Sequence, residues 1–396
     1  MKKKLLAILG SILLSTALLG VEVQLWEKWQ TELDPTYDEI IASFEKTNPD
    51  IKIKRVHYEV EDLRYNFQNA AFSGNPPALV VGPADTVGVY ATMGIIKPIN
   101  EVEGFDKSIL KDILEQGLEQ LTIDGELYGI PEQIGNHLTL VYNKKFVKTV
   151  PETFEELMAT DYGTEYKLVY NLNEPFWGIG FLAAYGGWIF DANNNPTLNT
   201  DSIKKGLDFM KKLKDTGTVP AECDYVIADT LFKDGKSAFI INGDWTFSDY
   251  AKVLGDNMGL ARVPKVEGGD YYVPTTAVQG IFVAEGLDSD VEKAAAKFLA
   301  YITSKDVQLK ITAKNKTLPV NKAAANDPAV TNDAFLAGST AQMLVGKPMP
   351  VVPEMRAIWD ALRPGQEDIM SGRATAAEAA LNMQKIAEEK IAEMNQ

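Results

Sequence analysis

The sequence predicts an α/β protein built as two lobes. With 396 residues, the chain is longer than one ordinary domain and suits two. Strand and helix patterns alternate from residue 21 to residue 81 and recur through the middle of the chain, as in sheets covered by helices. Because no long flexible linker separates these stretches, we expect the chain to cross between the lobes more than once.

The amino terminus is typical of a secretory signal peptide. Three lysines precede an apolar stretch, residues 5–19, that is too short for a stable membrane span. Small residues permit cleavage after Ala17 or Gly20, so we expect residues 1–20 to be removed. Val21 stands where a lipoprotein signal requires its cysteine. The sequence therefore predicts a periplasmic or other extracytoplasmic location without a lipid attachment site.

The pattern after this leader predicts three strands and two helices. Apolar residues alternate over 21–25, which indicates a strand. Asp34 followed by Pro35 predicts the start of a helix, with Asp34 as its N-cap. A strand over 51–56, a helix over 60–72 and a strand over 78–81 follow. Consecutive β-α-β units of this kind predict a parallel sheet.

Later stretches repeat the alternation. The pattern predicts strands over 138–142, 169–172 and 238–242, an amphipathic helix over 203–214, and extended chain over 273–283. Thr375 and Glu378 form a capping box that predicts the start of the last helix.

Composition excludes several classes of function. The formal net charge of −16 makes a nucleic-acid partner unsuitable and favours a soluble monomer. One cysteine, Cys223, and two histidines, His57 and His137, leave no set of residues for a cysteine- or histidine-based metal site. No phosphate-binding loop, dinucleotide fingerprint or nucleophile elbow is present, so we expect no cofactor and no enzyme activity. A carboxylate pair for glycoside hydrolysis stays open, because the chain has 55 acidic residues.

Tryptophans fall where α/β proteins place ligands. Trp26, Trp177, Trp245 and Trp359 lie at predicted strand ends or near turns, and acidic residues accompany several of them. Flat aromatic rings can cover the C–H face of a pyranose while carboxylates accept hydrogen bonds from its hydroxyls. The alternative is that each tryptophan packs in a core or on a lobe surface.

Several stretches resemble the extracellular solute-binding proteins of the maltose and maltodextrin type. The similarity runs in order over essentially the whole mature chain, and it is carried by residues 138–144, 171–175, 183–187, 232–238, 241–245 and 348–363. The resemblance implies a two-lobed periplasmic-binding-protein fold with crossing hinge strands and a ligand cleft. One lobe would comprise residues 21–134 and 281–328, and the other residues 135–280 and 329–396. An oligosaccharide ligand, a membrane permease and an ATPase are the implied partners.

The resemblance also implies which residues hold the sugar. Glu174 would bind hydroxyls, and Trp245 and Trp359 would stack on sugar rings. Asp85 would accept hydroxyls, although a helix cap is an equal alternative. Phe176 matches a stacking tyrosine of the family, Met349 a cleft methionine with packing as the alternative, and Arg363 a binding arginine with a helix salt bridge as the alternative. Trp177, next to Phe176, is either wall or core. Residues 27–32 do not reproduce the family's aspartate–lysine pair, so Trp29 is put forward as a replacement platform, with a surface position as the alternative.

Departures from the family pattern leave the ligand open. Gly82, Thr86 and Asn136 stand where the maltose binder has tryptophan, arginine and glutamate. Trehalose, a pentose oligomer or another glucan are therefore alternative ligands. A secreted glycoside hydrolase and a purely structural surface protein are the alternatives from other classes.

Overall fold

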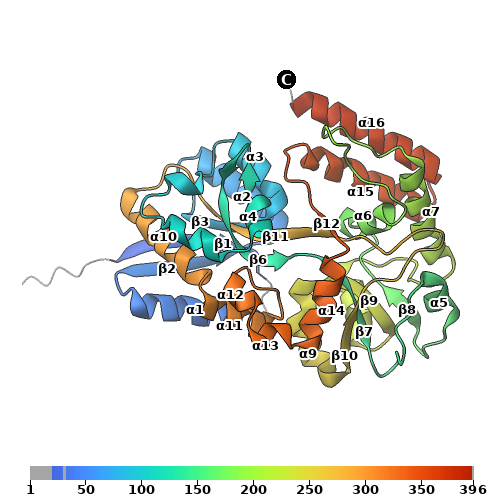
Figure 1. The fold of residues 1–396 in the computed structure, drawn as a ribbon. Coiled ribbons are helices and arrows are strands. Elements are labelled where there is room, and N and C mark those ends of the chain that lie inside the picture. The colour runs from blue at the N-terminus through green and yellow to red at the C-terminus, as the bar shows by residue number, and fades with distance from the viewer. Residues whose placement is uncertain (1–19, 30–32, 395–396) are drawn as a thin grey trace, which may run out of the picture.

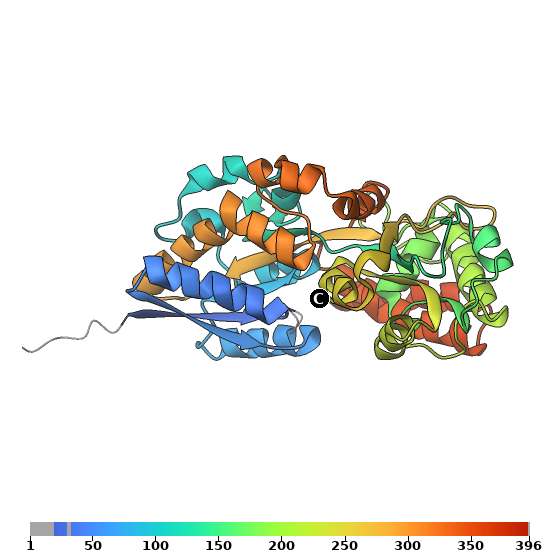
Figure 2. The same ribbon diagram turned by 90° about the horizontal axis from the view of Figure 1, so that it is seen from below.

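The computed structural model describes residues 20–29 and 33–394, which form two bodies, each a β-sheet covered by helices (Figures 1 and 2). Apart from Gly20, the predicted signal peptide lies outside these described residues. In the part of the chain that the structure describes, no helix is both long and apolar enough to cross a membrane. The predicted α/β architecture of two lobes is confirmed by this arrangement.

The first sheet begins with three parallel strands. β1 (Val21–Glu27) lies between β2 (Ile51–His57) and β3 (Leu79–Pro83), and it runs parallel to both. Alternate residues of β1 point into the core, as the apolar pattern predicted. The parallel arrangement expected from the β-α-β units is therefore confirmed.

Three further strands enter this sheet from more distant parts of the chain, and two of them run opposite to the first three. β11 (Thr275–Val283) is antiparallel to β3 and also to β6 (Gly129–Gly135). β12 (Lys347–Pro348) pairs with the first residues of β11. Figure 1 shows β6 and β11 running from the first body toward the second. The complete sheet is mixed, which local patterns alone did not predict.

The second sheet has the strand order β10-β7-β9-β8. Its strands are β7 (Leu138–Asn143), β8 (Tyr166–Val169), β9 (Ser237–Gly243) and β10 (Met258–Ala261). The strand predicted over 169–172 is wrong in its bounds. β8 ends at Val169, the first residue of the predicted strand. The apolar residues that follow are buried in the turn that leads to the next helix, so burial there does not require a strand.

Helices cover both sheets. Those of the first body are α1 (Asp34–Thr47), α2 (Val60–Phe72), α3 (Val87–Thr92), α4 (Glu115–Glu119), α10 (Ser289–Ile302), α11 (Lys305–Asn315), α12 (Lys322–Ala325) and α13 (Pro328–Thr331). Those along the second sheet are α5 (Phe154–Ala159), α6 (Pro175–Ala183), α7 (Asp201–Asp215), α8 (Tyr225–Lys233), α9 (Phe247–Leu254), α14 (Ala334–Met343), α15 (Met355–Ser371) and α16 (Ala376–Met394). Short elements complete the chain: η2 (Ala84–Thr86), η3 (Ile99–Glu101), η4 (Lys107–Asp112), β4 (Thr122–Ile123), β5 (Glu126–Leu127), η5 (Asp244–Thr246) and η6 (Gly255–Asn257).

Two predicted helix starts had different outcomes. The capping box before α16 is confirmed, because the backbone N–H and hydroxyl of Thr375 donate to Glu378 at 2.9 and 2.8 Å. Asp34, in contrast, is the first helical residue of α1 and does not cap it, since Leu33 occupies the N-cap position. The Asp34 carboxylate instead pairs with Arg55 on β2. A cross-element ion pair has replaced the expected local hydrogen bond.

Buried apolar side chains form two separate cores. One core joins residues within 23–134 to residues within 278–336. The other joins residues within 138–277 to residues within 349–387. The chain therefore passes between the cores three times, and the ends of β6, β11 and β12 lie at these crossings.

Candidate functional site

A cleft with a volume of about 680 Å³ lies between the two bodies. Its size falls within the range of small-molecule sites, roughly 300–1,000 Å³. All nine residues put forward from the sequence line it: Trp29, Asp85, Glu174, Phe176, Trp177, Trp245, Met349, Trp359 and Arg363. The structure therefore brings together residues that are up to about 330 positions apart in the chain. Their roles in binding stay predictions.

One side of the cleft is a cluster of five aromatic side chains, here called the aromatic wall: Phe176, Trp177, Tyr225, Trp245 and Trp359. The ring centroid of Phe176 lies 6.1 Å from that of Trp245 and 6.5 Å from that of Trp359. Trp177 lies 6.1 Å from Trp245 and 6.0 Å from Tyr225. These tilted and edge contacts leave the cleft lined by large apolar surfaces.

Ends of secondary-structure elements hold this wall in place. Phe176 and Trp177 lie in the first turn of α6, whose start is set by Pro175. Trp245 lies in η5, directly after β9 ends at Gly243. A Cβ atom at Gly243 would lie 2.0 Å from the Trp245 ring, so the ring rests directly on the backbone. Its position is therefore fixed by close packing.

Two of the four predicted tryptophans, Trp177 and Trp29, differ from the other two in how they meet the cleft. Trp177 is 6% exposed, and its indole N–H donates to the Ile241 carbonyl at 2.8 Å. It supports the wall from behind. Trp29 is also 6% exposed, and one face of its ring stacks on Tyr37 with a centroid distance of 3.5 Å. That face is covered, so Trp29 presents only part of its ring to the cleft.

Two polar contacts lie among the aromatic residues. Arg363 donates to both carboxylate oxygens of Glu174, at 2.8 and 3.3 Å. This fork orients the carboxylate at the edge of the cleft. Met349 is buried and contributes its side chain to the cleft lining. Glu174 and Arg363, which were put forward separately as sugar ligands, therefore form an ion pair with each other.

Asp85 faces the aromatic wall from the first body. It lies within η2 and does not cap a helix, since Pro83 occupies that position and no side-chain cap bond forms. Its Oδ2 accepts a hydrogen bond from the Trp359 indole at 3.3 Å, whereas its buried Oδ1 has no partner. Burial raises the pKa of the Asp85 carboxyl, and the nearby Arg64 charge opposes that rise. A buried acceptor without a partner favours a ligand that can donate to it.

Sequence reasoning missed three polar residues of the cleft floor: Lys28, Gln133 and Gln279. Gln133 on β6 lies directly opposite Gln279 on β11, and the buried Gln279 Oε1 has no partner. Burial lowers the pKa of Lys28, although Asp85 and Glu132 raise it. A glutamine inside an apolar strand pattern was the available signal for the first pair. Lys28 gave none, because a lysine in a loop is ordinarily solvated.

A buried carboxylate connects the aromatic wall to the crossing strands. Asp244, the residue before Trp245, accepts from Gln133 at 3.2 Å and from the backbone N–H of Asn136 at 3.1 Å. Gly135 has a φ of +129°, and a Cβ there would lie 2.5 Å from Asp244 Oδ2. Burial raises the pKa of Asp244 to about 7. The bend that ends β6 and the base of the wall therefore share one set of hydrogen bonds.

Comparison with protein families identifies the class of this chain. The model of the bacterial extracellular solute-binding proteins matches residues 39–338. The chain belongs to this family. The resemblance inferred from the sequence is thereby confirmed, and the cleft lies where both bodies of this solute-binding protein meet.

Alignments with named relatives cover most of this solute-binding protein. It is 27% identical to a galactooligosaccharide-binding protein of Bacillus subtilis, covering 91% of this chain and 87% of that one. A maltooligosaccharide ABC transporter solute-binding lipoprotein of Streptococcus pneumoniae is 26% identical, with coverages of 81% and 77%. Among solved structures, the maltose/maltodextrin-binding domain MalE of Bdellovibrio bacteriovorus bound to maltotriose is 36% identical. It superposes with a TM-score of 0.87 over 94% of this chain and 100% of that chain.

Proposed function

We propose that this protein captures maltodextrin-type oligosaccharides outside the cytoplasm and delivers them to the permease and ATPase of an ABC importer. It does so as a monomer, by binding and without catalysis. The aromatic wall facing Asp85 across the cleft is the observation that carries the proposal. The relatives that bind maltose-type sugars support the choice of ligand.

The chemistry of the cleft matches the two kinds of surface on a pyranose. Phe176, Trp245 and Trp359 offer ring faces and edges to the C–H groups of the sugar. The unpartnered oxygens Asp85 Oδ1 and Gln279 Oε1 are suited to accept hydrogen bonds from sugar hydroxyls. A sugar bound here would satisfy buried polar atoms that otherwise cost free energy.

Binding would favour a closed arrangement of the lobes. We infer that the lobes follow the two cores, with the hinge at the ends of β6, β11 and β12. Val330 and Leu336 pack in the first core, which supports a third crossing later than residue 328. A ligand that touches both lobes shifts the balance toward closure by its preference for the closed form.

A titration tests the proposal directly. Adding maltose or maltotriose to the mature protein at constant salt should change its tryptophan fluorescence in a saturable way at micromolar sugar. The reason is that three tryptophans of the aromatic wall line the cleft. No change with either sugar would contradict the maltodextrin assignment.

Galactooligosaccharide is the second candidate ligand, because the Bacillus subtilis relative named for it covers most of this chain. The same titration with a β-galactosyl oligosaccharide separates the two. Saturation by the galactosyl sugar alone would keep the transport role and replace the sugar. Slow release of free sugar from either ligand during incubation would instead indicate a glycoside hydrolase.

A further inference from the structure

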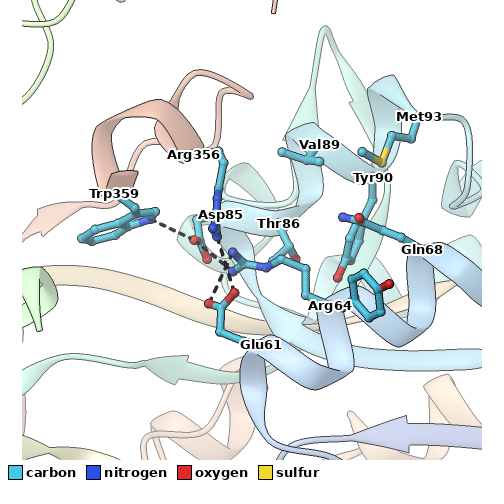
Figure 3. A pocket seen from close by; sticks show the side chains of 11 residues that line it. Glu61, Arg64, Gln68, Asp85, Thr86, Val89, Tyr90, Met93, Arg356 and Trp359 are labelled. Carbon is cyan, nitrogen blue, oxygen red and sulfur yellow. Dashed lines mark hydrogen bonds and ion pairs between the residues drawn. The ribbon is translucent and has the colours of Figure 1, made fainter. Parts of the chain in front are cut away.

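A second cavity, with a volume of about 330 Å³, adjoins the cleft between α2, α3 and α15 (Figure 3). Both cavities are lined by the same five residues where they meet: Glu61, Arg64, Asp85, Trp359 and Arg356. The second cavity, here called the side pocket, is completed by Tyr65, Gln68, Thr86, Val89, Tyr90 and Met93.

The five shared residues form a chain of polar contacts between cleft and side pocket. The Trp359 indole donates to Asp85 at 3.3 Å, and an Arg64 nitrogen lies 3.7 Å from the same carboxylate oxygen. Arg64 and Arg356 lie 3.6 and 3.5 Å from Glu61. Figure 3 shows these links mainly on one side of Thr86, with Gln68 and Met93 on the other.

The outer part of this chain, the pair of Glu61 and Arg356, is weak enough for a ligand to displace, whereas Arg64 and Asp85 are largely buried. The Glu61 and Arg356 side chains are largely exposed, and exposed ion pairs contribute only about 0–1 kcal/mol to stability. At its exposed edge the separation between the two cavities therefore depends on the side chains of Glu61 and Arg356.

The lining of the side pocket resembles that of the cleft in chemistry. Tyr65, Val89 and Met93 provide apolar surface, and the Gln68 amide can both donate and accept hydrogen bonds. The Nε–H of Arg64 is buried without a partner. A buried donor of this kind is stabilised by a hydroxyl or ring oxygen that accepts from it.

We propose that the side pocket binds one further sugar unit of the oligosaccharide, beyond the units held on the aromatic wall. This inference rests on the proposed function and adds to it a preference for longer chains. The volume supports one unit only, since about 330 Å³ is near the lower limit of small-molecule sites, roughly 300 Å³.

Isothermal titration calorimetry with maltose and maltotetraose tests this inference on the wild type, Tyr65→Ala and Gln68→Ala. Tyr65 is 68% exposed, so its truncation should not disturb folding. We expect each variant to bind maltotetraose roughly 3- to 10-fold more weakly, from the loss of one ring contact or hydrogen bond. Maltose affinity should be unchanged.

Phe72→Ala is the matched control, because Phe72 is 67% exposed on the same helix and does not line either cavity. It should leave both affinities unchanged. The side-pocket proposal would be overturned if a variant lost equal affinity for the two sugars, or lost no affinity for maltotetraose. The proposed function would still stand in either case, because the wild type would bind maltose. Failure of the wild type to bind either sugar would overturn both.

Discussion

Replacing Trp245 by alanine should weaken maltotriose binding roughly 30-fold or more, because a central tryptophan in a binding site commonly contributes about 2 kcal/mol. Trp245 contacts both Phe176 and Trp177 in the aromatic wall, and its ring rests on Gly243. Its loss removes stacking surface and also loosens its neighbours. Calorimetric titration of the variant against wild type measures the change in dissociation constant.

A graded series separates stacking from general destabilisation. Trp245→Phe keeps an aromatic ring and should lose only part of the affinity. Trp188→Phe changes a tryptophan that does not line the cleft and should bind as the wild type does. The role assigned to Trp245 would be wrong if Trp245→Ala bound normally while retaining its thermal stability.

The substitution Asp244→Asn should reduce the loss of folding stability that accompanies a rise in pH. Burial raises the pKa of Asp244 to about 7, whereas an aspartate in the unfolded chain titrates near 4. Between about pH 4 and 7 the unfolded chain has released this proton while the folded protein keeps it, so the folded protein loses stability as the pH rises through that range. Asparagine has no such cost. Relative to wild type, the variant should gain about 2 kcal/mol in free energy of unfolding between pH 5.5 and 8.

Urea unfolding at the two pH values measures this difference. Burial also raises the pKa of Glu132 to about 7 and lowers that of His137 to about 4, but both groups are present in both proteins. His137 faces Asp244, with 3.8 Å between Nδ1 and Oδ2, so the substitution can alter the titration of His137. That titration should therefore be followed by NMR in both the wild type and the variant. The exposed control Asp256→Asn should show the same difference from wild type at both pH values. If Asp244→Asn also differed from wild type by the same free energy of unfolding at both pH values, the raised pKa of Asp244 would not explain the pH dependence.

Local patterns predicted most elements because their causes are local. Alternation over 21–25 reflects a strand with one face in a core, and the Thr375–Glu378 capping box spans a single helical turn. The prediction was wrong where a distant partner competed, as at Asp34, which pairs with Arg55 instead of capping its helix. It also placed a strand over 169–172, since buried apolar residues do not distinguish a strand from a packed turn.

Most of the candidate site was predicted from collinear resemblance, with Trp177 and Trp29 added from their places beside matched or altered motifs, and all nine residues line the cleft. Lys28, Gln133 and Gln279 were missed, because a lysine in a loop is ordinarily solvated and the two glutamines face each other only when β6 pairs with β11. Trp29 was put forward as a replacement platform for a sugar ring, but one face of its ring is covered by Tyr37.

By itself, the sequence determined the two-lobed α/β class, the family and four of the five residues of the aromatic wall, all except Tyr225. Periods of two and 3.6 residues and an ordered set of family motifs are all properties of the linear chain. Only the tertiary structure decided that Asp244 joins the crossing strands to the aromatic wall, and that a side pocket adjoins Asp85. Burial and unpartnered hydrogen-bonding atoms depend on residues that are distant in the chain and become neighbours only when both cores form.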